Sequence, residues 1–403
     1  MTADPSQHGA LHEPLVEEYL RLGLAVGRHI DGFVDAYYGP RELSDQASAS
    51  SPEDPASLVA RSRRLLGDLA ADGGLDPARR RWLRSQALGL HTTAQKLNGD
   101  PIAYLDEIES CYGVRATFVP EDEFADAHGR LDAALPGTGD LADRYIAWKE
   151  AQVVPVEVLG EAVESLAEDF RSRTSKTFGL PDGEHVDFEL TANKPWGGFN
   201  YYLGDLRSRV AINTDLPVLS PVLGALVAHE AYPGHHTEHC RKEAGLVRRQ
   251  RQLEETIFLV GTPQCLLAEG LADLGLEIIA GRRPEPVVAE HLKPLKVPYD
   301  ADIAGELATA AEALGAVRGN AAILLHDRGA GMDEAIDYVA RWALVPRARA
   351  AKTVEFLVDA TWRAYVFCYI DGLRMCRQFV GGDAGRFERL ISEQLIPAQL
   401  VAG

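Results

Sequence analysis

Apolar residues recur at every third or fourth position through most of this 403-residue chain. Gly39-Pro40 ends one such series, which runs through Leu15, Tyr19, Leu22, Val26, Ile30, Phe33 and Tyr37. This spacing places the apolar side chains on one face of a helix. It predicts a single long amphipathic helix at this position and a mainly helical protein overall.

One region departs from the helical spacing. Between residues 185 and 214, β-branched and aromatic residues alternate around Gly204-Asp205, which predicts a hairpin with a neighbouring strand. Ser220-Pro221 then suits the cap and first turn of a helix, and the apolar run VLGALVA follows. We therefore expect a small antiparallel sheet followed directly by a buried helix.

The charge balance excludes some classes of partner. The chain has 41 Lys+Arg against 60 Asp+Glu, a formal net charge of −19. Proteins that bind phosphate backbones or anionic membrane surfaces need a basic face, so we expect neither nucleic acid nor a membrane as partner. The sequence does not indicate an oligomeric state.

The remaining composition predicts a cytoplasmic location. The five cysteines include no C-x-x-C pair, which is typical of buried thiols in a reducing compartment. The first twenty residues lack the basic and apolar regions of a secretory signal. The most apolar stretch, residues 256–280, is interrupted by three carboxylates and does not fit a membrane span.

Four of the 12 histidines fall within 11 residues, in the stretch His229-Glu-Ala-Tyr-Pro-Gly-His235-His236-Thr-Glu-His239. A single helical histidine is usually structural, but four of them with two carboxylates at the end of an apolar helix indicate a metal site. In the H-E-x-x-H zinc motif, two histidines four residues apart share one helix face, and the glutamate acts as base on metal-activated water.

Here the fourth position of that motif is Pro233. Proline lacks an N–H and its ring collides with the carbonyl group of His229, so the helix must bend or widen. If two extra residues are absorbed as a bulge, His235 returns to the position that i+4 normally occupies. His236 regains the right direction but lies about 10 Å further along the axis. We therefore predict His229 and His235 as zinc ligands and Glu230 as general base, with His236 as an alternate ligand.

The same stretch of residues also contains the inverted motif H-x-x-E-H, from His235 to His239. In that interpretation His235 and His239 bind the metal from a regular helix, and Glu238 is the base. No bulge is needed, but His229 and Glu230 are left without a role. We favour the first interpretation and keep this one as its alternative.

A catalytic zinc also needs a third protein ligand. Glu269, Asp273 and Glu277 recur at i, i+4 and i+8 on one side of an otherwise apolar helix. Buried carboxylates are costly unless they are paired or coordinated. Glu269 is the predicted third ligand, and Asp273 is predicted to orient a ligand histidine. The alternative is a half-exposed helix whose acidic stripe lies in water.

At these residues the chain resembles the bacterial domain of unknown function 885 family, zincin-like proteins that their motifs assign to the metallopeptidases. The resemblance covers roughly residues 195–377. It is carried by the stretch from His229 to His236, by Glu269-Gly270 and, more loosely, by Tyr369-Ile-Asp-Gly372. It implies a zincin-like helical fold of the gluzincin type and a zinc-dependent peptidase. Leu271 and Thr237-Glu238 depart from the family's pattern.

Peptide hydrolysis also needs a donor for the developing oxyanion. Tyr365 and Tyr369 are four residues apart on one face of a C-terminal helix, where core packing is an equal alternative. The resemblance points to Tyr369 as the oxyanion donor, with Tyr365 second. Arg363 and Arg374 are nearby cations that either bind a substrate carboxylate or are solvated.

The substrate backbone needs an edge to bind. The strand at residues 209–214, with Asn213, lies just before the metal helix, and we expect the hairpin to border the cleft and to serve as the edge that binds an extended peptide. Ordinary sheet packing is the alternative. We expect a helical region over residues 1–135 that restricts the cleft to small peptides, and a zincin-like catalytic region over residues 136–403, joined in one compact unit.

The predicted function is a zinc-dependent hydrolase that acts on small peptides with Glu230 as general base. Two alternatives stay open. One is a peptide-binding or scaffold protein that keeps the fold without catalysis, and the other is a metal-dependent hydrolase of a different amide or ester.

Overall fold

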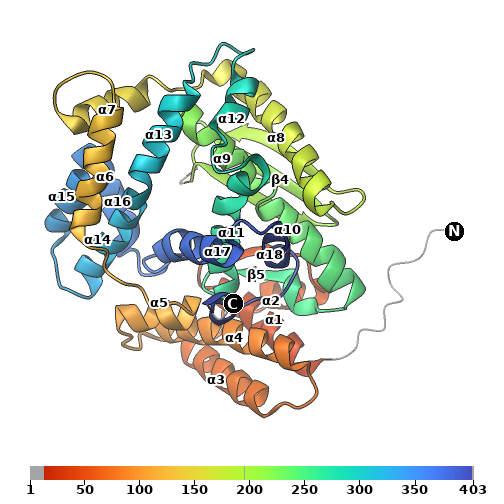
Figure 1. Ribbon diagram of the computed structural model, residues 1–403. Coiled ribbons are helices and arrows are strands. Elements are labelled where there is room, and N and C mark those ends of the chain that lie inside the picture. The colour runs from red at the N-terminus through yellow and green to blue at the C-terminus, as the bar shows by residue number, and fades with distance from the viewer. Residues whose placement is uncertain (1–12, 195, 402–403) are drawn as a thin grey trace.

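The computed structural model describes residues 13–194 and 196–401. It is 64% helix and 8% strand, which confirms the mainly helical prediction. The buried helix α11 (Pro263–Ala280) lies at the centre of the molecule (Figure 1). Within the described ranges, no helix combines the length and apolarity that crossing a membrane requires. Residues 1–12, which carry most of the stretch analysed for a secretory signal, lie outside the described part.

The single helix predicted between residues 15 and 37 is wrong. Helix α1 (Pro14–Gly27) ends ten residues earlier, and the chain then turns through Gly32, whose φ is 75°. Strand β1 (Val34–Tyr37) follows and pairs antiparallel with β5 (Ile257–Leu259). The apolar spacing could not reveal this strand, because the partner that stabilises it lies far along the chain.

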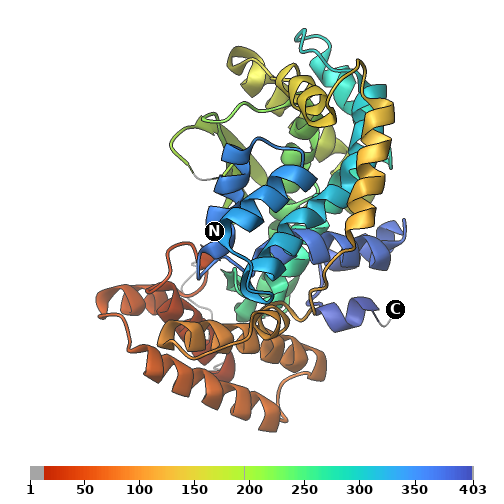
Figure 2. The ribbon, with the colours of Figure 1, turned by 90° about the vertical axis from the view of Figure 1, so that its left-hand side faces the viewer.

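The first helices form a layer of their own with a separate core. Helices α2 (Arg41–Ala49), α3 (Pro55–Ala71) and α4 (Pro77–Asn98) pack with α1, and they form the red and orange layer at the bottom of Figure 2. Fully buried Tyr19 and Trp82 belong to this core, and Ile257 and Leu259 of β5 join it. Strand β5 therefore ties the first layer to the rest of the molecule.

A second, larger core runs through the remaining elements. Residues 104–135, predicted as part of the N-terminal region, contribute to this core and not to the first. Its helices outside the candidate site are α5 (Tyr104–Tyr112), α6 (Glu121–Ala134), α7 (Leu141–Glu150), α8 (Val156–Phe178), α12 (Glu285–Leu292), α13 (Ala301–Ala311), α14 (Val317–His326), α15 (Met332–Trp342), α16 (Arg347–Val358), α17 (Leu373–Val380), α18 (Ala384–Leu390) and α19 (Pro397–Val401).

The predicted small sheet next to the histidine helix is present, but it is mixed. Strands β2 (His185–Thr191), β4 (Arg207–Asn213) and β3 (Gly198–Gly204) lie in that order. The β3–β4 hairpin turns at Gly204-Asp205 as predicted, whereas β2 runs parallel to β4. Because β4 is paired on both sides, residues 209–214 cannot themselves pair with a peptide, and β3 is the strand of the predicted hairpin that has a free edge. Strands β2 and β3 each have an outer edge without a strand partner among the described residues.

The histidine-bearing segment follows the sheet as two helices, α9 (Ser220–Glu230) and α10 (His235–Lys242). Pro221 lies in the first turn as predicted, but Ser220 is already helical and does not cap it. Its hydroxyl instead donates to the carbonyl oxygen of Pro298, 3.0 Å away. Helix α9 packs against α11, and this contact sets the histidines beside the acidic face of α11.

Candidate metal centre

The helix is fully interrupted between α9 and α10, at the place where the sequence predicted a bulge. The segment 231–234 is not helical, and the backbone N–H of Gly234 donates to the carbonyl oxygen of Ala228 at 2.9 Å. A Cβ at Gly234 would collide with the carbonyl oxygen of His229, so this close approach requires glycine. The break redirects the chain so that His235, in the first turn of α10, meets His229 in the last turn of α9.

Three predicted ligands, His229, His235 and Glu269, come together at one point. The Nε2 atoms of the two histidines are 3.1 Å apart. The Glu269 carboxylate places Oε2 at 3.4 Å from Nε2 of His229 and Oε1 at 3.6 Å from Nε2 of His235. Ligand atoms about 2.0 Å from a tetrahedral zinc ion are about 3.3 Å apart. The separation of the two histidine nitrogens fits one edge of such a tetrahedron, and each of these nitrogens faces a different oxygen of Glu269 at a similar distance. The three residues leave a fourth position open.

The surroundings of Glu269 support this fit. Its side chain is buried, and Oε2 has no hydrogen-bond partner among the described residues. A buried carboxylate oxygen without a partner is costly, and a bound cation would remove that cost. Oε1 accepts a hydrogen bond of 2.7 Å from the hydroxyl group of Tyr365. Tyr365, predicted as the second oxyanion donor, thus binds the predicted metal ligand Glu269 in this structure.

Asp273 lies one turn after Glu269 on α11 and makes the contact predicted for it. Its Oδ1 is 2.8 Å from Nδ1 of His229. Burial lowers the pKa of His229, but the hydrogen bond to Asp273 and the nearby carboxylates of Glu269 and Glu230 outweigh burial and raise that pKa well above its usual value. Burial and the charge of His229 lower the pKa of His235 well below its usual value. Without metal, His229 therefore carries a proton and His235 is neutral.

Glu230, the predicted base, is buried directly beside this group. Its backbone carbonyl accepts a hydrogen bond of 2.6 Å from the side chain of Asn200 on β3. A Cβ at Gly198, also on β3, would lie 3.2 Å from Oε1 of Glu230. Burial raises the pKa of Glu230 to about 7, opposed by His229 and reinforced by nearby carboxylates. A carboxylate with this pKa can accept and return a proton near neutral pH.

Asp35 is a further site carboxylate that the sequence analysis missed. It lies on β1 where the register with β5 shifts between Val34 and Ala36, and such bulges re-aim a side chain. Burial and the negative charges of Glu269 and Glu230 raise its pKa to about 7. The side chain of Asp35 makes no hydrogen bond or ion pair within the described residues. Because residues 15–37 were predicted as one helix, the sequence analysis did not consider Asp35 as part of the site.

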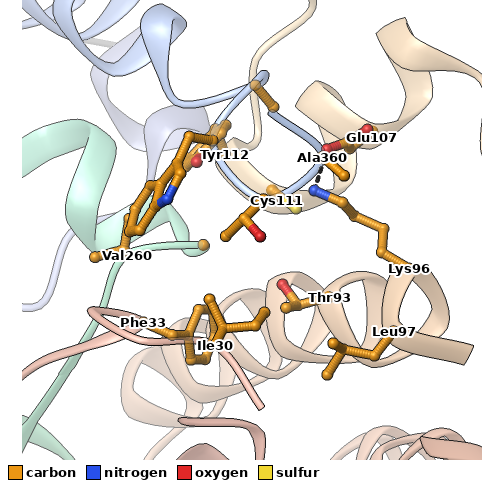
Figure 3. A pocket seen from close by; sticks show the side chains of 14 residues that line it. Ile30, Phe33, Thr93, Lys96, Leu97, Glu107, Cys111, Tyr112, Val260 and Ala360 are labelled. Carbon is orange, nitrogen blue, oxygen red and sulfur yellow. Dashed lines mark hydrogen bonds and ion pairs between the residues drawn. The ribbon is translucent and has the colours of Figure 1, made fainter. Parts of the chain in front are cut away.

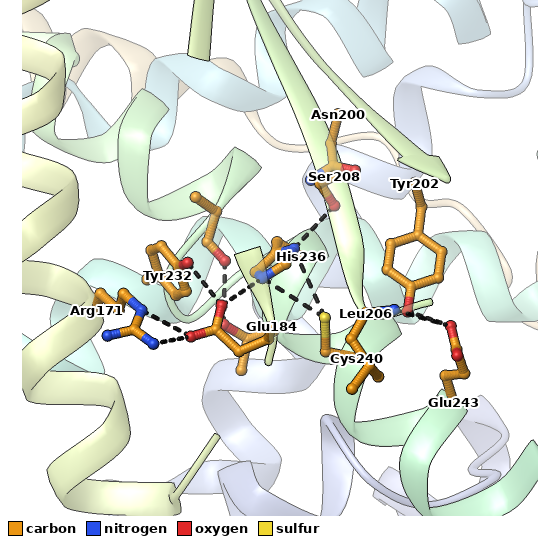
Figure 4. Close-up of polar contacts among 12 residues, drawn as sticks. Arg171, Glu184, Asn200, Tyr202, Leu206, Ser208, Tyr232, His236, Cys240 and Glu243 are labelled. Atoms are coloured by element: carbon orange, nitrogen blue, oxygen red, sulfur yellow. Dashed lines mark hydrogen bonds and ion pairs between the residues drawn. The ribbon is translucent and has the colours of Figure 1, made fainter. Parts of the chain in front are cut away.

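The alternative motif does not assemble a metal site. Glu238 forms an ion pair with Lys242 at 2.7 Å. The ring of His239 stacks on Tyr202 with centroids 4.6 Å apart, and burial lowers its pKa to about 3. His236 is fully buried and is bound by Glu184 and Ser208 (Figure 4). None of the three belongs to the group around Glu269, so the H-x-x-E-H interpretation is not supported.

The predicted Glu269-Gly270 and Asp371-Gly372 segments meet backbone to backbone. A Cβ at Gly270 would collide with the backbone of Gly372, in the π-helical turn η4 (Cys368–Gly372), and a Cβ at Gly372 would collide with the carbonyl oxygen of Leu266. This contact sets the C-terminal tyrosines against α11. The ring centroids of Tyr365 and Tyr369 are 5.3 Å apart, which places Tyr369 beside the tyrosine that holds Glu269.

The two predicted carboxylate-binding arginines are already paired. Arg363 binds Glu107 and Arg374 binds Asp371, each at 2.5 Å. Arg318 of α14 was not predicted. Its guanidinium lies 5.6 Å from the ring centroid of Tyr369, and it forms no ion pair with any residue that the structure describes.

Asn213 has a structural role. Its side-chain amide donates to the carbonyl oxygens of Lys194 and Trp196, each at 2.9 Å. These bonds fix the segment that enters β3, whose first residue, Gly198, lies against Glu230. Asn213 therefore acts on the site through the backbone.

A cavity of about 110 Å³ lies between the first helices and the segment before η4 (Figure 3). Phe33 and Trp362 line it, and Lys96 and Glu107 form an ion pair of 2.5 Å at its side. The Trp362 ring packs edge to face on Tyr365, with centroids 5.9 Å apart. None of the residues that line this cavity is a predicted metal ligand. The cavity is therefore separate from the candidate site, which is the group of His229, His235 and Glu269.

Comparison with known proteins gives a likeness of fold. No family model and no curated protein matches the chain. Among solved structures, the chain is similar to "the putative lipoprotein from Colwellia psychrerythraea", with a TM-score of 0.55 and 17% sequence identity over 86% of this chain. It spans 65% of the length of that protein. A "putative lipoprotein of unknown function from Shewanella oneidensis" gives a TM-score of 0.47 and 14% identity, over 89% of this chain and 75% of the other.

Proposed function

We propose that this protein is a zinc-dependent hydrolase that cleaves small peptides. The observation that carries the proposal is the group of His229, His235 and Glu269, whose ligand atoms lie within 4.8 Å of one another, with one buried carboxylate oxygen of Glu269 left without a hydrogen-bond partner among the described residues. Glu230 lies next to that group in the sequence and in space. The resemblance to the domain of unknown function 885 family supports the same conclusion.

In the proposed mechanism His229, His235 and Glu269 hold the ion, which, when bound, polarises a substrate carbonyl and lowers the pKa of water. Glu230 accepts a proton from the attacking water and returns it to the leaving nitrogen, a task suited to its pKa of about 7. The hydroxyl group of Tyr369 donates a hydrogen bond to the developing oxyanion.

The substrate side is assigned to two features. The outer edge of β3, beginning at Gly198 beside Glu230, offers free backbone groups to an extended peptide. Arg318 is a better candidate for a terminal carboxylate than Arg363 or Arg374, because both of those are occupied by acidic partners. Short peptides with a free C-terminal carboxylate are therefore the proposed substrates.

The proposed location is the cytoplasm. All five cysteines are free and buried, which agrees with a reducing compartment. The names of the two similar structures make a lipid-anchored location the alternative. Nucleic acid is not among the proposed partners because of the net charge of −19.

The test combines metal analysis with hydrolysis. Purified protein is assayed for bound zinc and then incubated with a mixed peptide library, with and without a chelator. We expect one zinc per chain and cleavage that stops when the chelator is added. Glu230→Gln should abolish cleavage while zinc stays bound. Glu238→Gln, on the neighbouring helix, should still cleave the peptides.

Two results would replace the proposal by its alternatives. Bound peptides without cleavage, unchanged by Glu230→Gln, would indicate a peptide-binding or scaffold protein. Zinc-dependent cleavage of amide or ester substrates other than peptides would keep the chemistry and change the substrate class.

A further inference from the structure

Glu184 collects hydrogen bonds from three elements in a buried network (Figure 4). It lies in the loop between α8 and β2 and is 5% exposed. Its Oε2 accepts from the hydroxyl group of Tyr232 at 2.8 Å and is 2.9 Å from Nε2 of His236. Its Oε1 accepts from Nε of Arg171 on α8 at 2.7 Å. One carboxylate oxygen of Glu184 thus binds two residues of the segment that carries the clustered histidines.

Both residues belong to the junction between the ligand helix α9 and the ligand helix α10. Tyr232 lies inside the break and His236 lies in the first turn of α10, with His235 directly before it. Because both donors meet at a single oxygen atom, the separation between Tyr232 in the break and His236 at the start of α10 is fixed. The position of His235 relative to His229 depends on that separation.

The far side of His236 is fixed as well. The Oγ atom of Ser208, on the central strand β4, is 2.9 Å from Nδ1 of His236. Since Glu184 accepts from Nε2–H, Nδ1 is the acceptor and Ser208 is the donor. The ring is therefore held from both edges, by the sheet and by the loop before β2.

This arrangement of serine, histidine and glutamate is not a nucleophilic triad. In such triads the carboxylate binds Nδ1 and the serine binds Nε2, and here the two positions are exchanged. Ser208 and His236 are also completely buried, so a substrate cannot reach the hydroxyl group. The network can influence chemistry only by holding the backbone that carries His235.

We propose that Glu184 is a positioning residue for the metal centre: by binding Tyr232 and His236 together, it holds His235 against His229 in the separation that one zinc ion requires. This inference rests on the proposed function for its catalytic consequence, but the geometry of the two histidines tests it separately. Residues that hold metal ligands in place commonly change metal affinity by 10- to 100-fold when they are replaced.

The experiment replaces Glu184 by Gln and compares zinc affinity with that of the wild-type protein, using a competing chelator and counting only folded protein. The amide cannot accept from both donors and also bind Arg171, so we expect an affinity about tenfold lower. Tyr232→Phe removes a single donor from Glu184 and should lower zinc affinity by a smaller factor. This second variant keeps the test open if the first one folds poorly.

Glu243→Gln is the matched control. Glu243 is also buried, accepts from the hydroxyl group of Tyr202 at 2.5 Å and binds Arg248, but it contacts neither end of the break (Figure 4). Its replacement should lower the melting temperature to a similar extent and leave zinc affinity within about twofold. Equal zinc affinity in Glu184→Gln and wild type would overturn the inference.

Crystal structures of the metal-free wild type and of Glu184→Gln separate this inference from the proposed function. We expect the 3.1 Å contact between the Nε2 atoms of His229 and His235 in the wild type and a longer separation in the variant. If the wild type binds no zinc or cleaves nothing, the proposed function fails and this comparison still decides the role of Glu184. An unchanged separation in the variant would overturn the positioning role.

Discussion

Tyr365 donates a hydrogen bond of 2.7 Å to Oε1 of Glu269, the same oxygen atom that lies 3.6 Å from Nε2 of His235. The other oxygen of Glu269 faces His229 at 3.4 Å and has no hydrogen-bond partner in the described part of the chain. The tyrosine therefore fixes the orientation in which each carboxylate oxygen faces one histidine. This contact joins the C-terminal segment to the candidate metal centre.

Replacing Tyr365 by Phe should lower zinc affinity about tenfold, because Glu269 loses the bond that orients it. The ring is retained, so the packing with Trp362 and the overall stability should change little. Chelator competition measures the affinity, and thermal unfolding without metal measures the stability. An unchanged zinc affinity would show that Tyr365 does not orient a ligand.

Zinc binding should release protons. In the metal-free site the pKa of His229 is well above its usual value, so this residue is protonated at neutral pH and must lose a proton to bind metal. Zinc affinity should therefore fall as the pH falls, by about tenfold per unit while one proton is displaced. Calorimetry at pH 7 in buffers of different ionisation enthalpy should show about one proton released per zinc.

Asp273→Asn should reduce that proton release. The substitution removes the carboxylate that accepts from Nδ1 of His229 at 2.8 Å and that helps to raise its pKa. Zinc affinity should fall about 10-fold or more, because the histidine also loses its orienting partner. Proton release equal to that of the wild type would contradict the assignment of His229 as the protonated ligand.

Gly270→Ala should be strongly destabilising. The added methyl group would collide with the backbone of Gly372, which cannot rotate away as a side chain could. We expect a loss of about 3 kcal/mol or more in the free energy of unfolding. Gly160→Ala is the matched control in another helix, where nothing lies within 4 Å of the new methyl group and about 0.5–1 kcal/mol of stabilisation is expected. Chemical denaturation measures both values.

Arg318→Ala should raise KM about tenfold for peptides with a free C-terminal carboxylate and leave kcat nearly unchanged. Peptides with a C-terminal amide should be cleaved equally well by both proteins, since they lack the charge that Arg318 binds. Arg328→Ala is the control, because that guanidinium also lies over an aromatic ring, 3.9 Å from the centroid of Phe118. If Arg318→Ala raised KM equally for peptides with a C-terminal amide and for those with a free carboxylate, Arg318 would have a packing role and would not bind the carboxylate.

The sequence alone predicted the features of this protein that depend on residues close together along the chain. Helical spacing identified the fold class, and the collision of Pro233 with a regular helix predicted that His235 rather than His236 faces His229. The position of Asp273 one turn after Glu269 followed from their i, i+4 spacing on α11. These features depend on residues within a few turns of one another.

Features that depend on distant pairing were missed. Asp35 reaches the site because β1 pairs with β5, and a helical pattern in residues 15–37 concealed that strand. Arg363 and Arg374 look available in the sequence, but Glu107 and Asp371 occupy them in the fold. Glu184 and Arg318 carry no motif, and only their contacts with His236 and Tyr369 reveal them.

The most direct test of the account is anomalous diffraction at the zinc edge from crystals soaked in zinc. The account predicts one strong peak per chain, about 2 Å from Nε2 of His229, Nε2 of His235 and a carboxylate oxygen of Glu269. No peak at this position, or a peak bound by His236 or His239 in its place, would contradict it.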